Sequence, residues 1–301
     1  MIKSIDPADL PTPQVHGYLL GAVAPRPIAF ASTIDEQGNV NLSPFSFFNV
    51  FSANPPVMIF SPARRGSNNT TKHTYENVLC VPEVVINIVN HPVVEQMSLS
   101  STEYAEDVNE FVKAGLTEVP SIKVKPPRVA ECPVSFECTV EDVIQLGDQG
   151  GAGNLVICKV VMIHLQEQYL DENGKLDTTR LDLVGRMGGS WYCRASGESL
   201  FEIPKPLRTR GIGVDQLPAS IRNSVVLTGN NLGRLGNLES LPSEEEIQAM
   251  RDLDVVQHIM NKPDIDSAER IVALHKMAQQ MIENGDTAGA LRTLMVFGTD
   301  E

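Results

Sequence analysis

The chain has 301 residues, of which 42% are hydrophobic and 21% charged, and its formal net charge at pH 7 is −14. This composition is typical of a globular protein, and the acidic balance disfavours nonspecific binding to nucleic acid or to anionic membranes. The longest apolar runs, such as residues 84–89, are too short to span a bilayer, and the first residues lack the charged and apolar regions of a secretory signal. Five cysteines without a CxxC pair fit a reducing compartment better than a disulfide framework, so we expect a cytoplasmic protein.

Short strands dominate the first two thirds of the sequence. Residues 27–34 and 40–48 are strand-like and flank a turn at 35–39, where Gly38 can adopt a positive φ. Further apolar runs follow at 57–60, 84–89, 134–140 and 155–165. Two short amphipathic segments lie between them at 93–99 and 107–114, and Gly115 closes the second. Strands that succeed one another without long alternating helices favour an antiparallel barrel over a Rossmann sheet.

The segment NLSPFSFFNVFSANPPVMIFS, residues 41–61, concentrates phenylalanine, proline and serine and contains no acid, base or histidine. Two interpretations remain open at this point. The segment can be a buried strand pair, or it can be a platform for a flat ring whose polar edge meets small hydroxyl and main-chain groups.

The next segment, residues 61–74, gathers three bases, a histidine and several hydroxyl and amide side chains. Guanidinium and hydroxyl groups suit a phosphate monoester, because they form charge-assisted hydrogen bonds in a fork geometry. Residues 75–79 read as a short helix, so its N-terminal N–H groups would also favour an anion. A solvated loop is an equally good interpretation of this stretch taken alone.

The composition changes after about residue 199. Residues 201–206 predict an extended linker and residues 228–237 consecutive turns. A capping box at Ser243 predicts a helix to about residue 260, Asp266 or Ser267 caps a second, and 287–297 can add a third. These helices look too few to form a core of their own, so we expect them to pack on the barrel or on a neighbouring subunit.

Several catalytic motifs are excluded. The glycine-rich stretch 147–154 precedes a strand instead of a helix, which disfavours a dinucleotide or triphosphate cradle. The six histidines show no metal-ligand spacing, so no metal site is predicted, and His164 reads as a core or rim histidine. No nucleophile elbow is present. If the protein is an enzyme, a cofactor is expected to carry the reaction.

The stretches 23–78, 113–138 and 186–192 resemble the flavin reductase-like domain, an FMN-binding split β-barrel. The resemblance covers about residues 15–195. It is specific, because several separate blocks occur in order at family-like spacing. It implies a mainly β, antiparallel Greek-key barrel with short helices over residues 1–198. Residues 199–301 would then form a C-terminal linker and helical extension, and the family's arrangement implies a homodimer with FMN near the subunit boundary.

The resemblance also implies a set of cofactor-binding residues. The segment Asn41 to Asn49 would pass along the isoalloxazine ring, with the ring edge and ring face contacted by Ser43, Pro44, Ser46, Phe45, Phe47 and Phe48. The phosphate would be held by Ser61, Arg64, Ser67, Lys72, His73 and Thr74, although the family more often has aspartate at the position of His73. Arg26 is a further ring or ribityl candidate. Arg186, with Trp191 or Tyr192, would border the open face of the flavin or have a structural role.

Taken together, these features predict an NAD(P)H-dependent flavin reductase that transfers hydride from a nicotinamide to FMN. A monooxygenase or another electron acceptor would be its partner. One alternative is a flavoredoxin-like electron carrier with permanently bound FMN. Another, of a different class, is a flavin-binding or interaction protein without turnover, whose helical tail is a docking surface. Residues 203–242 are expected to cover the barrel mouth and to limit which acceptors reach FMN. Their four arginines would pair with the protein's own carboxylates or meet the pyrophosphate of a nicotinamide cofactor.

Overall fold

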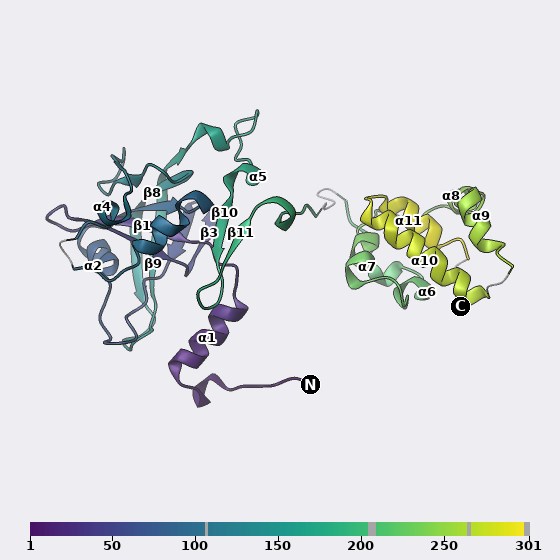
Figure 1. Cartoon of the computed structure of the whole chain (residues 1–301), viewed down its shortest axis with the longest axis horizontal. Coiled ribbons are helices and arrows are strands. Elements are labelled where there is room, and N and C mark those ends of the chain that lie inside the picture. The colour runs from purple at the N-terminus through teal and green to yellow at the C-terminus, as the bar shows by residue number, and fades with distance from the viewer. Residues whose placement is uncertain (106–107, 204–208, 264–265, 298–301) are drawn as a thin grey trace. The chain divides into compact units, whose positions relative to one another are not determined.

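The computed structural model describes residues 1–105, 108–203, 209–263 and 266–297 (Figure 1). The chain divides into two compact units, Met1–Phe201 and Glu202–Glu301. The first unit is mainly β with several short helices, and the second is helical in its described residues. No helix in the described ranges is long and apolar enough to cross a bilayer.

The first unit is built on one antiparallel sheet of seven strands in the order β2-β1-β5-β8-β9-β4-β3. The strands are β1 (Ala29–Ile34), β2 (Val40–Phe45), β3 (Phe48–Ala53), β4 (Pro56–Phe60), β5 (Glu83–Ile88), β8 (Val134–Gln145) and β9 (Asn154–Leu165). Two small ladders accompany it, β6 (Glu118–Val119) with β7 (Arg128–Val129) and β10 (Leu183–Arg186) with β11 (Tyr192–Ala195). The expectation of successive antiparallel strands is confirmed.

Strands β2 and β3 lie at opposite edges of this sheet, although only residues 46 and 47 separate them. The Cα atoms of Phe45 and Phe48 can be at most about 11 Å apart, since three trans peptide steps join them. The sheet therefore curls until its two edges approach one another at this connection. The single strand expected over 40–48 is two strands, because the chain crosses from one edge to the other at Ser46 and Phe47.

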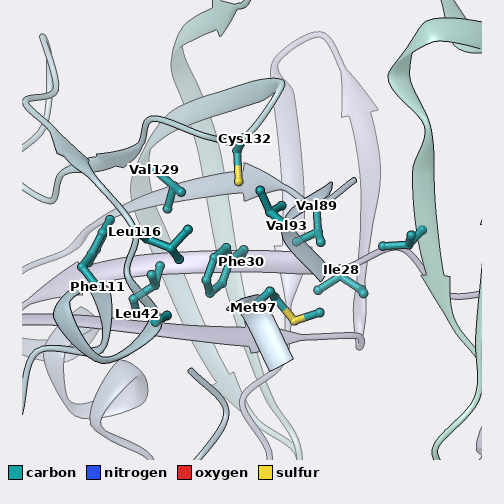
Figure 2. Packing of buried hydrophobic residues seen from close by; sticks show 12 residues of the cluster. Ile28, Phe30, Leu42, Val89, Val93, Met97, Phe111, Leu116, Val129 and Cys132 are labelled. Carbon is teal, nitrogen blue, oxygen red and sulfur yellow. The ribbon is translucent and has the colours of Figure 1, made fainter. Parts of the chain in front are cut away.

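Both faces of β1 are buried, because the sheet separates two hydrophobic clusters. Phe30 and Leu42 pack with Met97 of α3 (Val94–Leu99) and Phe111 of α4 (Glu110–Ala114) on one face (Figure 2). Ala29 and Ala31 point to the other face, because successive strand residues alternate. There they meet a cluster with Phe45, Phe60, Ile86 and Val78, the last from α2 (His73–Cys80).

The remaining helices of this unit are short. They are α1 (Thr12–Ala22) and α5 (Thr178–Leu181). The predicted end of the helix before Gly115 is confirmed. Gly115 ends α4 with φ 65°, in the left-handed region that glycine adopts freely. Of the amphipathic stretch expected over 107–114, residue 107 lies outside the described residues, and the helix begins at Glu110.

The second unit contains α6 (Ala219–Arg222), α7 (Gly229–Gly236), α8 (Glu244–Arg251), α9 (Asp254–Met260), α10 (Ser267–Glu283) and α11 (Thr287–Leu294). Leucine and isoleucine side chains from these helices form a buried cluster that includes Ile221, Leu235, Ile282 and Leu291. The expectation that the helices lack a core of their own is therefore wrong.

Two further expectations for this unit are corrected. Residues 228–237 are largely helix α7 instead of consecutive turns, because Thr228 and Asn231 form a capping box and Leu235 is fully buried. The helix expected from 243 to about 260 is two helices, since Leu253 adopts an extended conformation between α8 and α9. The capping box at Asp266 before α10 is confirmed.

Candidate functional site

A polar cleft lies where the N-terminus of α2 meets strand β2, and we call it the α2 cleft. Its wall combines short polar side chains from β2 with bases from the loop before α2. The residues that line it are Asn41, Ser43, Arg65, Lys72, His73, Thr74, the segment 100–104 and Glu110. Five of these twelve positions, Asn41, Ser43, Lys72, His73 and Thr74, belong to the set predicted from the sequence.

Helix α2 presents unsatisfied main-chain donors to this cleft. The helix begins at His73, and its N-cap residue Lys72 is extended and makes no side-chain capping bond among the described residues. The first N–H groups of a helix have no intrahelical acceptor, and the helix dipole makes that end favourable for an anion. The Thr74 hydroxyl is fixed by accepting a hydrogen bond from Asn41 Nδ2 at 2.8 Å. The N-terminus of α2 is therefore held firmly against β2 while its first donors stay available.

Positive charge gathers at the same point. Burial and the nearby Arg65 guanidinium lower the pKa of Lys72, and Glu103 only partly offsets them. Arg65 pairs with Glu103 at 3.0 Å and donates to Thr70 Oγ1 at 3.0 Å. A bound anion would relieve the repulsion between the two bases. The arrangement thus favours a ligand with negative charge.

Glu110 forms the back of the cleft. Its side chain is buried, and its carboxyl group accepts a hydrogen bond from the Leu42 main-chain N–H at 3.0 Å. Burial raises the pKa of Glu110, and the Leu42 hydrogen bond and the nearby His73 only partly counter this. The carboxyl group is therefore held at the cleft wall by Leu42, in surroundings that favour its protonated form.

Three residues predicted to hold a phosphate lie in the adjoining loop instead of lining the α2 cleft. Arg64 donates to Asn69 Oδ1 at 2.7 Å and to Asn69 O at 2.6 Å, and Asn69 is left-handed with φ 57°. Ser61 Oγ accepts a hydrogen bond from Asn154 N at 3.0 Å, while Ser67 is exposed. These contacts shape the loop that carries Arg65 toward the cleft.

The glycine-rich stretch 147–154 supports that loop. Asn154 Nδ2 donates to Pro62 O at 2.8 Å, and Gly151 N donates to Arg64 O at 3.0 Å. A Cβ atom at Gly153 would lie 2.8 Å from Ser61 Oγ, closer than real Cβ contacts come. The stretch therefore has a structural role beside the cleft, as its position before a strand indicates.

The segment predicted to carry a flat ring runs from the α2 cleft across the meeting point of the two sheet edges. Ser43 lines the cleft, whereas Phe45 is buried in the core, with its ring centroid 5.4 Å from that of Phe60. Phe48 is half-buried against the same core, and Phe47 is 39% exposed. The half-buried Pro44 and Ser46 lie in the same segment, and the exposed Asn49 accepts a hydrogen bond from the N–H of the next residue.

The main chains of Arg26 and Arg186 pair with each other, but their side chains make different contacts. Arg26 is buried and donates to Leu20 O and Val23 O at 2.7 Å each and to Met187 O at 3.0 Å. Its Nε also lies 3.4 Å from Ser46 Oγ. The Arg186 guanidinium lies 4.5 Å from the centroid of the Tyr192 ring and donates to Gly189 O at 2.6 Å. Arg26 thus ties α1, β10 and the ring segment together, and its donors are largely used.

The residues present fit a flavin mononucleotide. An uncapped helix end and two bases suit its phosphate, and a segment without ionisable side chains leads from there along the sheet edges. Sequence reasoning did not select Arg65, the segment 100–104 or Glu110. Arg65 carries a signal in the sequence, since it lies in the same basic loop as Arg64, whereas the others reach the cleft only through the tertiary fold.

Comparisons with known proteins agree on one family. A model of the flavin reductase-like domain matches residues 21–180. An uncharacterized protein from Aquifex aeolicus is 40% identical over 189 residues, which are 63% of this chain and 94% of the relative. The solved structure of nitrilotriacetate monooxygenase component B from Bacillus cereus is similar with a TM-score of 0.63 and 29% identity, covering 67% of this chain and 99% of that one. The 2-nitrobenzoate 2-nitroreductase NbaA from Pseudomonas fluorescens has a TM-score of 0.60 and 25% identity, covering 69% and 100%.

Proposed function

The chain belongs to the flavin reductase-like family, and from this premise we propose that it is a cytoplasmic FMN-binding, NAD(P)H-dependent flavin reductase. The observation that carries the proposal is the α2 cleft, in which an uncapped helix N-terminus faces Arg65 and Lys72. Its fold would be the split β-barrel of that family, and the curling of the sheet at Ser46 and Phe47 supports this.

The phosphate of FMN would occupy the α2 cleft. Lys72 and Arg65 would supply charge, and the main-chain N–H groups of His73 and Thr74 and the Ser43 hydroxyl would supply hydrogen bonds. Charge-assisted bonds of this kind are roughly twice as strong as neutral ones. Arg64, Ser61 and Ser67 would act through the loop that positions Arg65.

The ring would lie along the segment 43–48. When bound, FMN supplies the centre that accepts a hydride from a nicotinamide. The protein's own residues would hold the ring at its edge through Pro44, Ser46 and main-chain groups, and residues 41–61 themselves contribute no ionisable side chain. The Arg26 guanidinium, whose Nε lies 3.4 Å from Ser46 Oγ, is a charged group beside this edge. Orientation of the two reactants is the larger part of what such a protein contributes.

The functional form would be a homodimer. Strand β3 is an edge strand whose Val50 and Phe51 side chains are 62% and 64% exposed. Edge strands with exposed apolar side chains are normally covered by another chain or segment. A second copy would cover this strand close to the ring segment. Light scattering of the FMN-loaded protein at micromolar concentration should report a dimer, and a monomer would refute the assignment.

The electron acceptor would be a flavin-dependent monooxygenase. The similarity to a protein named as a monooxygenase component supports this choice. Anaerobic mixing of the FMN-loaded protein with NADH or NADPH should bleach the bound flavin at least as fast as steady-state turnover. Excess free FMN should then be reduced catalytically. Bleaching of one equivalent without further turnover would indicate an electron carrier instead. If neither NADH nor NADPH bleaches the flavin, the reductase proposal is refuted.

A further inference from the structure

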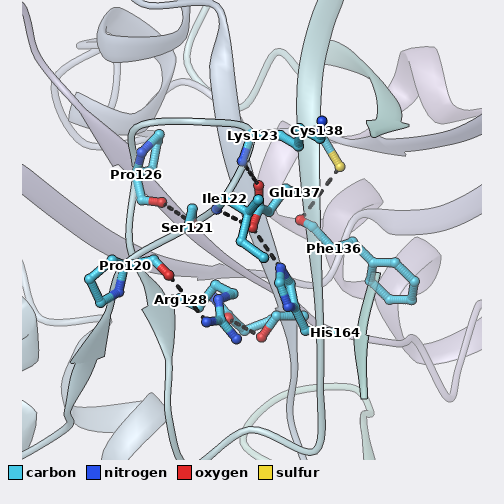
Figure 3. Close-up of polar contacts among 12 residues, drawn as sticks. Pro120, Ser121, Ile122, Lys123, Pro126, Arg128, Phe136, Glu137, Cys138 and His164 are labelled. Carbon is cyan, nitrogen blue, oxygen red and sulfur yellow. Dashed lines mark hydrogen bonds and ion pairs between the residues drawn. The ribbon is translucent and has the colours of Figure 1, made fainter. Parts of the chain in front are cut away.

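A carboxylate and an imidazole form a pair on strands β8 and β9, outside the lining of the α2 cleft. Glu137 of β8 is fully buried and lies 2.6 Å from Nε2 of the part-buried His164 of β9 (Figure 3). Strand pairing aligns Glu137 with Val85 of β5, then with Ser32 of β1 and Leu42 of β2. The main chains of Glu137 and Leu42 are therefore three strand spacings apart, which is at most roughly 15 Å.

The proton arrangement of this pair follows from the other partners of Glu137. Its two carboxyl oxygens accept hydrogen bonds from the main-chain N–H groups of Ile122 at 2.8 Å and Lys123 at 2.5 Å. Burial alone would raise the pKa of Glu137, but these bonds together with His164 hold that pKa below its usual value. Since the carboxylate is ionised and can only accept, His164 donates through Nε2. The second ring nitrogen of His164, Nδ1, is therefore the one left for another ligand.

A cavity of about 370 Å³ lies beside this imidazole, and we call it the Arg128 pocket. Polar side chains on its wall are Arg128, Ser135, His164 and Gln166, and apolar ones include Val119, Val129 and Leu165. The Gln166 amide is already used, because its Nε2 donates to Ala130 O at 2.8 Å and to Cys132 O at 2.9 Å. Its volume is in the range of pockets that bind small organic molecules. The Ser135 hydroxyl is already used, because it donates to Asn87 Oδ1 at 2.7 Å. The groups that remain for a ligand are the arginine and the histidine.

Arg128 has an unexplained polar atom. One terminal nitrogen of its guanidinium donates to Pro120 O at 3.1 Å, but Nε is buried and has no hydrogen-bond partner among the described residues. Figure 3 shows this guanidinium near the His164 imidazole, and both line the same pocket. A buried donor without an acceptor is costly, and such groups are rare in native structures. An anionic ligand would supply the missing acceptor with a small adjustment of the arginine.

We propose that the Arg128 pocket binds a small organic anion, with a carboxylate or phosphate group between Arg128 and His164 and an apolar body against Val119, Val129 and Leu165. Glu137, Arg128 and the buried Cys132 are the titratable or charged groups that face His164 from the surrounding elements. The Cys132 thiol stays protonated, because burial raises its pKa well above the usual range. A hydrogen bond from Nδ1 of His164 to the anion requires a hydrogen on that nitrogen, so any proton taken up with the anion ends there.

Isothermal titration of the full chain at saturating FMN tests the proposal, because FMN then occupies the α2 cleft. The probes are phenylacetate, phenyl phosphate and the neutral 2-phenylethanol. We expect at least one of the two anions to bind with one molecule per chain and with uptake of up to one proton. Proton uptake makes the apparent binding enthalpy depend on the ionisation enthalpy of the buffer. The stronger of the two anions identifies the anionic group, and 2-phenylethanol should bind at least about ten-fold more weakly.

Variants distinguish this pocket from other basic sites. Arg128→Gln and His164→Gln should each weaken the anion about ten-fold or more, and His164→Gln should also abolish proton uptake. Arg128→Lys keeps the charge and should retain part of the affinity. Arg180→Gln removes a base that pairs with Asp177 outside this pocket, so it should leave the affinity for the anion unchanged. Absence of binding by both anions, equal binding of the neutral probe, or equal affinity in all variants would overturn the proposal.

Discussion

Replacing Lys72 by alanine should weaken FMN binding while leaving riboflavin binding nearly unchanged. Lys72 lines the α2 cleft together with the N-terminus of α2, so its ammonium group meets only the part of FMN that riboflavin lacks. A hydrogen bond to a charged group contributes about 1.5–3 kcal/mol, and partial exposure of Lys72 reduces this to roughly 1–2 kcal/mol. The FMN dissociation constant should therefore rise by about 5–30-fold.

Fluorescence titration of the apoprotein with FMN and with riboflavin measures the effect. Lys175→Ala is the matched control, because it also removes one ammonium group but from an exposed position that does not line the α2 cleft. Riboflavin should bind each variant within about two-fold of the wild type. Equal losses for FMN and riboflavin in Lys72→Ala would show that the residue supports the fold and does not bind phosphate.

Arg64→Ala completes the comparison. Both hydrogen bonds of its side chain go to Asn69, so its loss should lower the free energy of unfolding by about 1–2 kcal/mol. Its effect on FMN should be smaller than that of Lys72→Ala, because Arg64 acts through the loop. If Arg64→Ala weakens FMN more than Lys72→Ala does, the phosphate lies at Arg64 and the α2 cleft is the wrong site.

Three further predictions concern stability. Because burial raises the pKa of Glu110, its proton stabilises the folded state at low pH, and this contribution is lost as pH rises through the folded-state pKa. Glu110→Gln should therefore be more stable than the wild type by about 0.5–1 kcal/mol at pH 8 in urea titrations, with the difference disappearing near pH 4; equal stability at both pH values would contradict this. Gly153→Ala should cost about 1–3 kcal/mol, since its Cβ would lie 2.8 Å from Ser61 Oγ, and the cost should shrink in a Ser61→Ala background; an unchanged cost there would exclude the clash. Because each unit has its own buried clusters, fragments 1–201 and 202–301 should each unfold cooperatively by circular dichroism, and a non-cooperative 202–301 would show that its core is insufficient.

Local chemistry explains which elements could be predicted from the sequence. The turn at 35–39, the glycine at the end of α4 and the cap of α10 depend on residues within a few positions of each other. Helix α7 was not predicted because its three glycines lower helix propensity, and burial of Leu235 in the tertiary core outweighs that cost. The split of 40–48 into β2 and β3 was not predicted either, since it depends on the partners of each strand and not on apolar pattern.

Part of the candidate site could likewise be predicted from local sequence, and the rest depends on the tertiary fold. The polar and basic character of residues 61–74 indicated an anion site without the structure, and Lys72, His73 and Thr74 do line the α2 cleft. The sequence alone cannot say whether Arg64 or Arg65 reaches the cleft, because this depends on the loop conformation. The side chain of Arg64 donates to the left-handed Asn69, whereas Arg65 lines the cleft. Glu110 reaches the cleft from α4 by bonding the Leu42 N–H, a contact 68 positions apart in sequence.

The crossing at Ser46 and Phe47 connects these observations. The chain leaves one sheet edge at the end of β2 and joins the other edge at Phe48, the first residue of β3. Ser43 therefore lines the cleft while Phe48 pairs with β4 at the other edge. The same few residues therefore reach both an anion-binding point and a line of small polar and main-chain groups beside it. A charged side chain at the buried positions of this stretch, such as Leu42, Phe45 or Phe60, would be desolvated at high cost. The exposed Val50 and Phe51 of β3 have no such constraint, so the absence of charge there calls for a covering surface instead.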